Sequence, residues 1–178
     1  MPDLLDNYCQ LVTRVDALCH GIAADLGGQI TCAAGCSSCC IPITVFPVEA
    51  AAMRKELATL PTQQADKIRQ HVSQPFDTEH CPLLHNHRCL LYAARPIICR
   101  THGLPIIYTE HGQRQSDCCP RNLSEAESVS GSSVVNLDTL NTLLVAVNSI
   151  YLTQSGSSEL SARLTISEII LHHFKLEI

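Results

Sequence analysis

The chain has 178 residues, 46% of them hydrophobic, a formal net charge of −5 and only 12 Lys and Arg. This length suffices for one ordinary hydrophobic core, so we expect a single domain over residues 1–178. The thinly spread basic residues form no stripe that could neutralise phosphates, which argues against nucleic acid as a partner. The apolar runs are too short to cross a bilayer and the N-terminus does not look like a secretory signal, so we expect a cytoplasmic protein without a membrane partner.

Helical patterns occupy both ends of the chain. Residues 3–27 carry apolar side chains at a spacing near 3.6 and run into Gly27 and Gly28, which predicts one amphipathic helix. Pro47 suits the first position of a second helix. The pattern predicts further helices over residues 47–60, 61–73, 137–154 and 166–174.

Short extended segments lie between these helices. Residues 81–92, "CPLLHNHRCLLY", have two apolar runs around a polar turn and predict a hairpin. A second hairpin is expected to turn at His111 and Gly112. The segment "IPITVFP" suits a short strand, and serine-rich residues 127–135 indicate a mobile connection. We therefore expect a mainly α fold with small β-hairpins, compact around a cysteine-rich metal centre over residues 32–119.

Eleven cysteines are present, and nine of them lie between residues 32 and 119. Thiols are kept reduced in the cytosol, and an odd count with two vicinal pairs suits a disulfide framework poorly. Metal binding is therefore the leading interpretation. Cys9 and Cys19 lie on or beside the first helix, where we expect them to be core residues outside the site.

The stretch "CAAGCSSCC" contains Cys32, Cys36, Cys39 and Cys40 at the spacing C-x3-C-x2-C-C. Thiolates are soft donors that select zinc, iron, iron–sulfur clusters or cuprous copper. Side chains of successive residues point in different directions. The vicinal pair therefore indicates either two neighbouring metal positions, or one ligand and one core thiol.

Further cysteines follow on separate elements. A hairpin can present Cys81 and Cys89 from one small scaffold, and Cys99 follows Pro96, which suits the start of a short helix. Cys118 and Cys119 stand at the foot of the second hairpin. One zinc or one four-iron cluster takes about four thiolates, so nine thiols favour more than one metal position.

The histidines and a candidate enzyme motif are weaker indications of function than the cysteines. His102 follows Cys99 by three residues but is more often structural in such a place, and His85 and His87 in the hairpin turn are expected to be solvated. The spacing C-x3-C-x2-C also matches the radical SAM signature. That chemistry normally uses a repeated βα barrel, which this chain, with a helix before Cys32, does not offer.

The segments "CAAGCSSCC", "VEAAAM", "CPLL", "CLLYAARPIICR" and "HG" together resemble the cysteine-cluster (CxxCxxCC) family of zinc- or iron-chelating proteins, over about residues 32–119. Members are small, mostly helical bacterial proteins described as binding metal or iron–sulfur clusters. Flagellin lysine methylases resemble them in their cysteine region. The resemblance implies an iron–sulfur cluster or iron as cofactor, with zinc as the alternative. It also leaves open an iron–sulfur enzyme, redox or methyl-transferring.

The resemblance further implies which residues form the site. Its first spacing is x3 here where the family has x2, and Cys118 and Cys119 compete for one role. Arg95 and Arg100 belong to the motif, and a guanidinium beside the cofactor would offset thiolate charge and donate hydrogen bonds to sulfur. The implied core metal ligands are Cys36, Cys39, Cys40, Cys81, Cys89 and Cys99. Cys32 and one of Cys118 or Cys119 come next, which makes nine candidate ligands in all.

Overall fold

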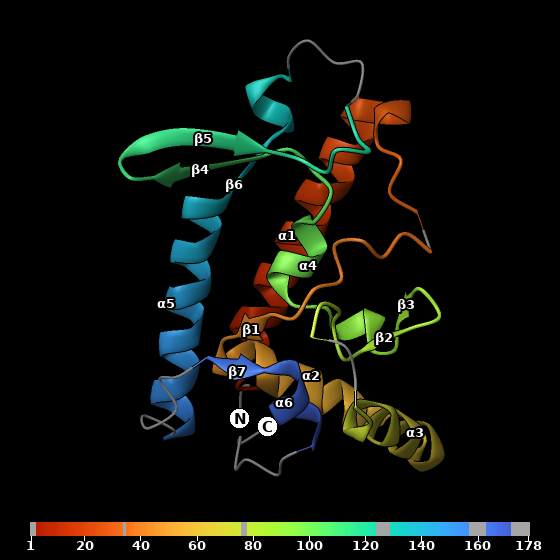
Figure 1. The fold of residues 1–178 in the computed structure, drawn as a ribbon. Helices are drawn as coiled ribbons and strands as arrows, with labels where there is room; N and C mark the ends of the chain where they lie inside the picture. Colours follow the sequence, from red (N-terminus) through yellow and green to blue (C-terminus); the bar gives the residue numbers. More distant parts are fainter. Residues whose placement is uncertain (1–2, 34, 76–77, 124–128, 157–162, 172–178) are drawn as a thin grey trace.

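The computed structural model describes residues 3–33, 35–75, 78–123, 129–156 and 163–171. Two long helices contact each other along the molecule, and three helices pack across one end of them (Figure 1). The long helices are α1 (Asp6–Leu26) and α5 (Leu137–Ser155). The others are α2 (Pro47–Thr59), α3 (Thr62–Ser73) and α6 (Ile166–Leu171), and the short α4 (Ile97–Thr101) contacts α1.

Three small sheets complete the described part of the chain. In the first two, antiparallel pairs form between β1 (Thr44–Val45) and β7 (Leu164–Thr165), and between β2 (Leu84–His85) and β3 (Arg88–Cys89). In the third, β4 (Ile106–Glu110) pairs antiparallel with β5 (Gln113–Asp117) and parallel with β6 (Val135–Asn136). Single 3-10 turns occur at η1 (Gly27–Gln29), η2 (Tyr92–Ala94) and η3 (Gly131–Ser133).

All of the longer helices contribute residues to one hydrophobic core, and α2 is the most buried of them. Val45, Val48 and Ala51 are completely buried, and Tyr151 of α5 is 1% exposed. Cys81 and Cys89 are half-buried and pack against this core. The hairpin that carries Cys89 is therefore anchored by ordinary apolar packing, which fixes its place before any ligand is considered.

The expected fold class is confirmed as far as its mainly α character with small sheets. The predicted helices occur within a few residues of their expected bounds, and α1 ends at Gly27, whose φ of +53° suits glycine. The predicted 166–174 helix is present as α6, and its residues 172–174 lie outside the described part of the chain. The second hairpin turns at His111 and Gly112, both with positive φ.

Two details differ from the sequence-based expectation. The first hairpin is shorter than predicted: Cys81 precedes β2, and His85 pairs with Arg88, so the turn consists of Asn86 and His87. The described end of the serine-rich segment is not an irregular connection, because it forms η3 and β6. The backbone N–H of Val135 donates to the Pro105 carbonyl at 2.9 Å, which ties β6 to the start of β4. Residues 127 and 128 of that segment lie outside the description.

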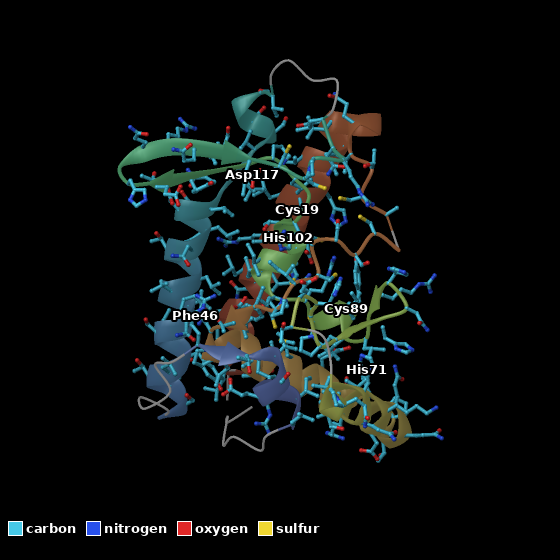
Figure 2. All side chains as sticks on the ribbon, viewed as in Figure 1. Cys19, Phe46, His71, Cys89, His102 and Asp117 are labelled. Carbon is cyan, nitrogen blue, oxygen red and sulfur yellow. The ribbon has the colours of Figure 1, made fainter. Side chains whose placement is uncertain are left out.

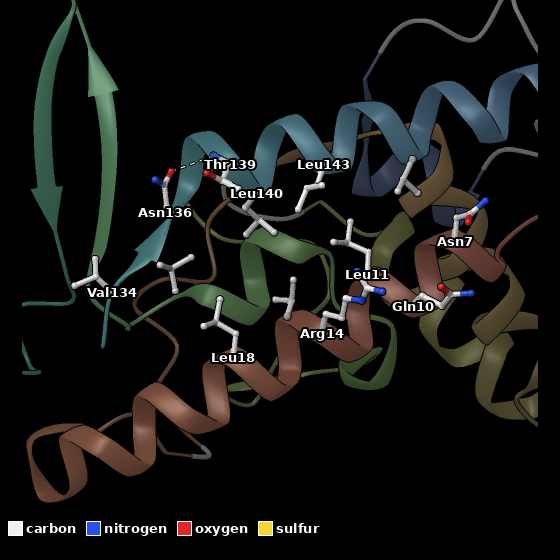
Figure 3. Close-up of a pocket in the computed structure, with 13 residues that line it drawn as sticks. Asn7, Gln10, Leu11, Arg14, Leu18, Val134, Asn136, Thr139, Leu140 and Leu143 are labelled. Carbon is white, nitrogen blue, oxygen red and sulfur yellow. Dashed lines mark hydrogen bonds between the residues drawn. The ribbon is translucent and has the colours of Figure 1, made fainter. Parts of the chain in front are cut away.

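A groove of about 430 Å³ separates parts of α1 and α5. Leu140 and Leu143 of α5 face Leu11 and Leu18 of α1 across it (Figure 3). The described residues that line the groove include no cysteine, so it is not part of the thiol-rich region. Within the described ranges, no helix is both long enough and apolar enough to span a membrane.

Candidate metal centre

Four cysteines from three segments gather beside α4, and we call them the four-thiol group. Cys40 comes from the loop after η1, Cys99 from α4, Cys81 from the turn just before β2, and Cys89, labelled in Figure 2, from β3 of the same hairpin. The Cys81 N–H donates to the Cys40 carbonyl at 2.8 Å, which joins the loop to the hairpin. Leu84 pairs with Cys89 across the hairpin and its N–H donates to the Cys81 carbonyl at 2.9 Å. Backbone hydrogen bonds thus set three of the four positions.

The electrostatics show that the four thiols are close enough to influence one another. Burial raises the pKa of each, most strongly for Cys99, to about 12. In every pair within the group, an ionised thiol on one residue further raises the pKa of the other. Without a cation, the group is therefore a set of protonated thiols. A bound cation would reverse this balance by replacing the protons.

Both hairpin thiols also have a backbone partner that favours the thiolate. A backbone hydrogen bond from Leu83 lowers the pKa of Cys81, and one from Leu91 lowers that of Cys89, in each case against the larger effect of burial. In both cases the partner lies two residues after the cysteine. Such N–H groups stabilise a thiolate bound to a metal. The donor set and its surroundings therefore fit a soft metal ion.

A second set of thiols, which we call the outer group, consists of Cys32, Cys36 and Cys39. Burial raises the pKa of Cys39, and thiolates at Cys40, Cys36 and Cys32 raise it further. Cys40, by contrast, is influenced first by its neighbours Cys81 and Cys89 after burial. The two members of the vicinal pair therefore have different further partners. They also interact with each other, through a side-chain hydrogen bond from Cys39 that lowers the pKa of Cys40, so the two thiol sets meet at this pair.

Two residues that the sequence did not single out donate hydrogen bonds to the outer group. Arg121 Nη1 donates to Cys36 Sγ at 3.6 Å, and Asn122 Nδ2 donates to Cys32 Sγ at 3.3 Å. Asn122 is 2% exposed, and its Oδ1 accepts the Thr31 N–H at 2.8 Å. The arginine and asparagine next to the Cys118–Cys119 pair thus hold the loop that carries the outer thiols. Their position two and three residues after that pair was the one available signal.

Gly103 leaves room for the Cys32 sulfur. A Cβ at this position would lie 2.5 Å from Cys32 Sγ, and the φ of +90° is itself unfavourable for other residues. Asn122 Nδ2 donates to the Gly103 carbonyl at 2.6 Å, so the same amide contacts both partners. The "HG" dipeptide of the motif therefore has a steric role: its glycine makes space for a sulfur atom.

Cys118 and Cys119 lie at the end of β5, as expected. Burial, Asp117 and Cys119 raise the pKa of Cys118. Its Sγ lies 3.6 Å from the Cys119 carbonyl oxygen and 4.0 Å from that of Asn122. Asn122 therefore contacts Cys118 through its backbone and Cys32 through its side chain, which links the Cys118–Cys119 pair to the outer group.

The two arginines of the motif have different surroundings. Arg100 Nη1 pairs with Asp16 of α1 at 2.7 and 2.9 Å, and Arg100 also donates to the carbonyls of Arg95 and Ala93. These oxygen partners make it an anchor between α4 and α1. Arg95 stacks on the Tyr92 ring at 3.6 Å, and its charge lowers the pKa of Cys89. Arg95 is thus the motif arginine whose charge reaches a thiol of the four-thiol group.

The remaining candidates are placed as follows. Cys9 is exposed, so the expectation that it belongs to the core is wrong, because the buried face of α1 is formed by residues such as Tyr8 and Leu11. Cys19 is half-buried and packs against the core. His85 and His87 are exposed, as expected. His102 is half-buried at the end of α4, and burial lowers its pKa, which favours the neutral imidazole.

Among the described residues, no three His, Cys, Asp or Glu side chains are already arranged to hold a metal ion. The thiols are gathered without forming a closed coordination shell. A site of this kind needs both deprotonation and side-chain rearrangement before it can bind metal.

The fold and these thiol groups define a small, mainly helical, thiol-rich protein. Residues 31–120, half of the chain, match the model of the CxxCxxCC family, which is described as a "putative zinc- or iron-chelating domain", and the chain belongs to this family. The match includes both thiol groups and the Cys118–Cys119 pair. No curated protein and no solved structure shows a significant match to the chain.

Proposed function

We propose that the protein binds zinc or iron through the four-thiol group of Cys40, Cys81, Cys89 and Cys99. The observation that carries this proposal is that three segments far apart in sequence bring these thiols within mutual electrostatic range. Four thiolates are the ligand number that a structural zinc or a four-iron cluster takes from protein. Gathering four half-buried thiols is unfavourable for their ionisation unless a cation compensates it.

The finer proposal is a centre with more than one metal position, containing iron or an iron–sulfur cluster. The vicinal pair supports it, because Cys40 interacts with Cys81 and Cys89 while its neighbour Cys39 interacts with Cys36 and Cys32 as well as with Cys40. Hydrogen bonds from Arg121 and Asn122 to sulfur atoms of the outer group would offset negative charge on bound thiolates. Cys118 and Cys119 lie just before these two donors in sequence and are further candidate ligands for the outer group.

We favour metal binding over an iron–sulfur enzyme. A redox or methyl-transferring enzyme would need an open metal position beside a substrate pocket. The groove between α1 and α5 is lined by described residues that include no cysteine. A second hollow of about 460 Å³ is lined by Cys118, at the edge of the cysteine-rich region. The four-thiol group is instead packed between hairpin, loop and helix.

The test is an anaerobic purification followed by reconstitution with iron and sulfide, or separately with zinc. We expect at least one tightly bound metal per chain, and with iron a brown sample whose broad sulfur-to-iron absorption bleaches in air. Colourless protein holding one zinc per chain after both treatments would refute the polynuclear iron centre but retain the zinc site. Folded protein that takes up no metal would refute the whole proposal.

A further inference from the structure

One carboxylate in the core connects the start of two helices. Glu49 is 2% exposed, yet both of its oxygens are used. Its Oε2 accepts the Phe46 N–H at 3.0 Å, at the start of α2, and its Oε1 accepts the Ile97 N–H at 3.0 Å, at the start of α4. The first bond is an ordinary N-terminal cap at the third helical position. The second joins two elements 48 residues apart in sequence.

The second bond matters because α4 has only five residues and carries Cys99. A helix this short has little stability of its own, so its direction is set by what holds its ends. Arg100 pairs with Asp16 and holds the end of α4 to α1. Glu49 holds the first residue of α4 to α2. Cys99 lies between these anchors, in a helix whose two ends are both held by side chains of other elements.

We propose that Glu49 is a positioning residue of the metal centre: by accepting the Ile97 N–H it orients α4 so that Cys99 completes the four-thiol group. This inference rests on the proposed metal-binding function. It assigns no direct contact with metal to Glu49, whose carboxylate orients α4 through the Ile97 N–H. The charge of Glu49 also raises the pKa of Cys99, so its removal slightly favours the thiolate, and the loss of orientation has to outweigh this effect. Losing a group that hydrogen-bonds to a metal ligand typically lowers metal affinity 10- to 100-fold. Glu49 is one step further from the ligand, so we expect a loss near the lower end of this range.

Glu168 provides a matched control. Its Oε2 accepts the Thr165 N–H at 2.8 Å at the start of α6, so it too caps a helix from the third helical position. Glu168→Ala therefore removes one helix cap, as Glu49→Ala does, but α6 carries none of the described cysteines. A cap is worth about 1 kcal/mol in either helix. Only Glu49→Ala releases α4, and it also empties a buried site in the core, whereas Glu168 is half-exposed and its loss removes a bond from the Thr165 hydroxyl as well.

The experiment titrates reduced, metal-free full-length protein with cobalt(II), a coloured stand-in for zinc, and records the thiolate-to-cobalt bands. We expect Glu49→Ala to lower cobalt affinity at least about 10-fold and to alter the bands, while Glu168→Ala stays within about twofold of wild type. Equal affinity in Glu49→Ala and wild type, or an equal loss in both variants, would overturn the inference. Absence of thiolate–cobalt bands in wild type would instead overturn the proposed function.

A measurement on wild type covers the case in which Glu49→Ala does not fold. The Ile97 amide, bonded to a buried carboxylate, should exchange its hydrogen much more slowly than an exposed amide, with protection comparable to that of the α2 interior. Rapid exchange at Ile97 in an otherwise protected core would show that Glu49 does not hold α4, and the inference would fall.

Discussion

Cys81→Ser, Cys89→Ser and Cys99→Ser are each expected to lower metal affinity by more than about 100-fold, because loss of a ligand should exceed the 10- to 100-fold cost of losing an indirect contact. Metal binding is coupled to folding, so the thermal midpoint of the metal-loaded protein should fall with the affinity. Cys40→Ser should behave like these three, since Cys40 interacts with the same thiols. Metal per chain and a thermal melt measure both effects.

The matched controls are Cys9→Ser and Cys19→Ser on α1. Cys9 is exposed, and neither residue belongs to the thiol groups described above, so both variants should retain wild-type metal content. Cys19→Ser can still lower stability slightly, because Cys19 packs against the core. If Cys9→Ser and Cys19→Ser lost as much metal as the variants of the four-thiol group, that group would not be the metal site.

Bound metal should make the free energy of unfolding rise with pH below about pH 9, where the thiols of the metal-free protein contribute no pH dependence. In the metal-free protein the pKa of Cys99 is raised from 9.0 to about 12. The folded state then retains a proton that the unfolded state releases, so the free energy of unfolding falls as pH rises between about 9 and 12. Below pH 9 these thiols are protonated in both states and contribute no slope.

With metal bound, the thiolates of the folded state hold no protons, whereas the unfolded chain binds them below about pH 9. The free energy of unfolding should therefore rise with pH, by about 1.4 kcal/mol per pH unit for each thiol that must lose its proton. Four thiols give about 5 kcal/mol per unit. Urea unfolding at pH 6, 7 and 8, with zinc and with chelator, measures the difference. Parallel pH profiles in the two forms would contradict thiolate ligation.

The helices were predictable because each depends on local signals. The apolar spacing of α1 and its terminal Gly27 are both visible in sequence, as is Pro47 at the start of α2. Strand β6 was not predictable, because it pairs with β4, about 30 positions away in sequence. The serine-rich residues before it are also typical of an irregular connection. The prediction that Cys9 is buried was wrong, because apolar spacing shows that a helix has a buried face but not which residues at the edge of that face are exposed.

The site shows the same limit. That the cysteines belong together followed from their number and spacing, and their vicinal pairs indicated more than one thiol set. Which cysteines share a set depends on tertiary contacts such as the Cys81 N–H bond to the Cys40 carbonyl. The donors to sulfur also differ from those expected: Arg100 bonds to oxygens, while Arg121 and Asn122 contact the outer thiols. Side-chain partners of this kind leave no periodic trace in a sequence.

The most direct test of the central claim is differential alkylation of the cysteines, read by mass spectrometry, in metal-loaded and chelator-treated protein under reducing conditions. A bound metal removes ligand thiolates from reaction. We expect Cys40, Cys81, Cys89 and Cys99 to react slowly in the chelator-treated protein, because their pKa values are raised, and not to react when metal is bound, while the exposed Cys9 reacts at the same rate in both forms. Identical labelling of the four-thiol group with and without bound metal would show that the metal is held elsewhere and would contradict the account.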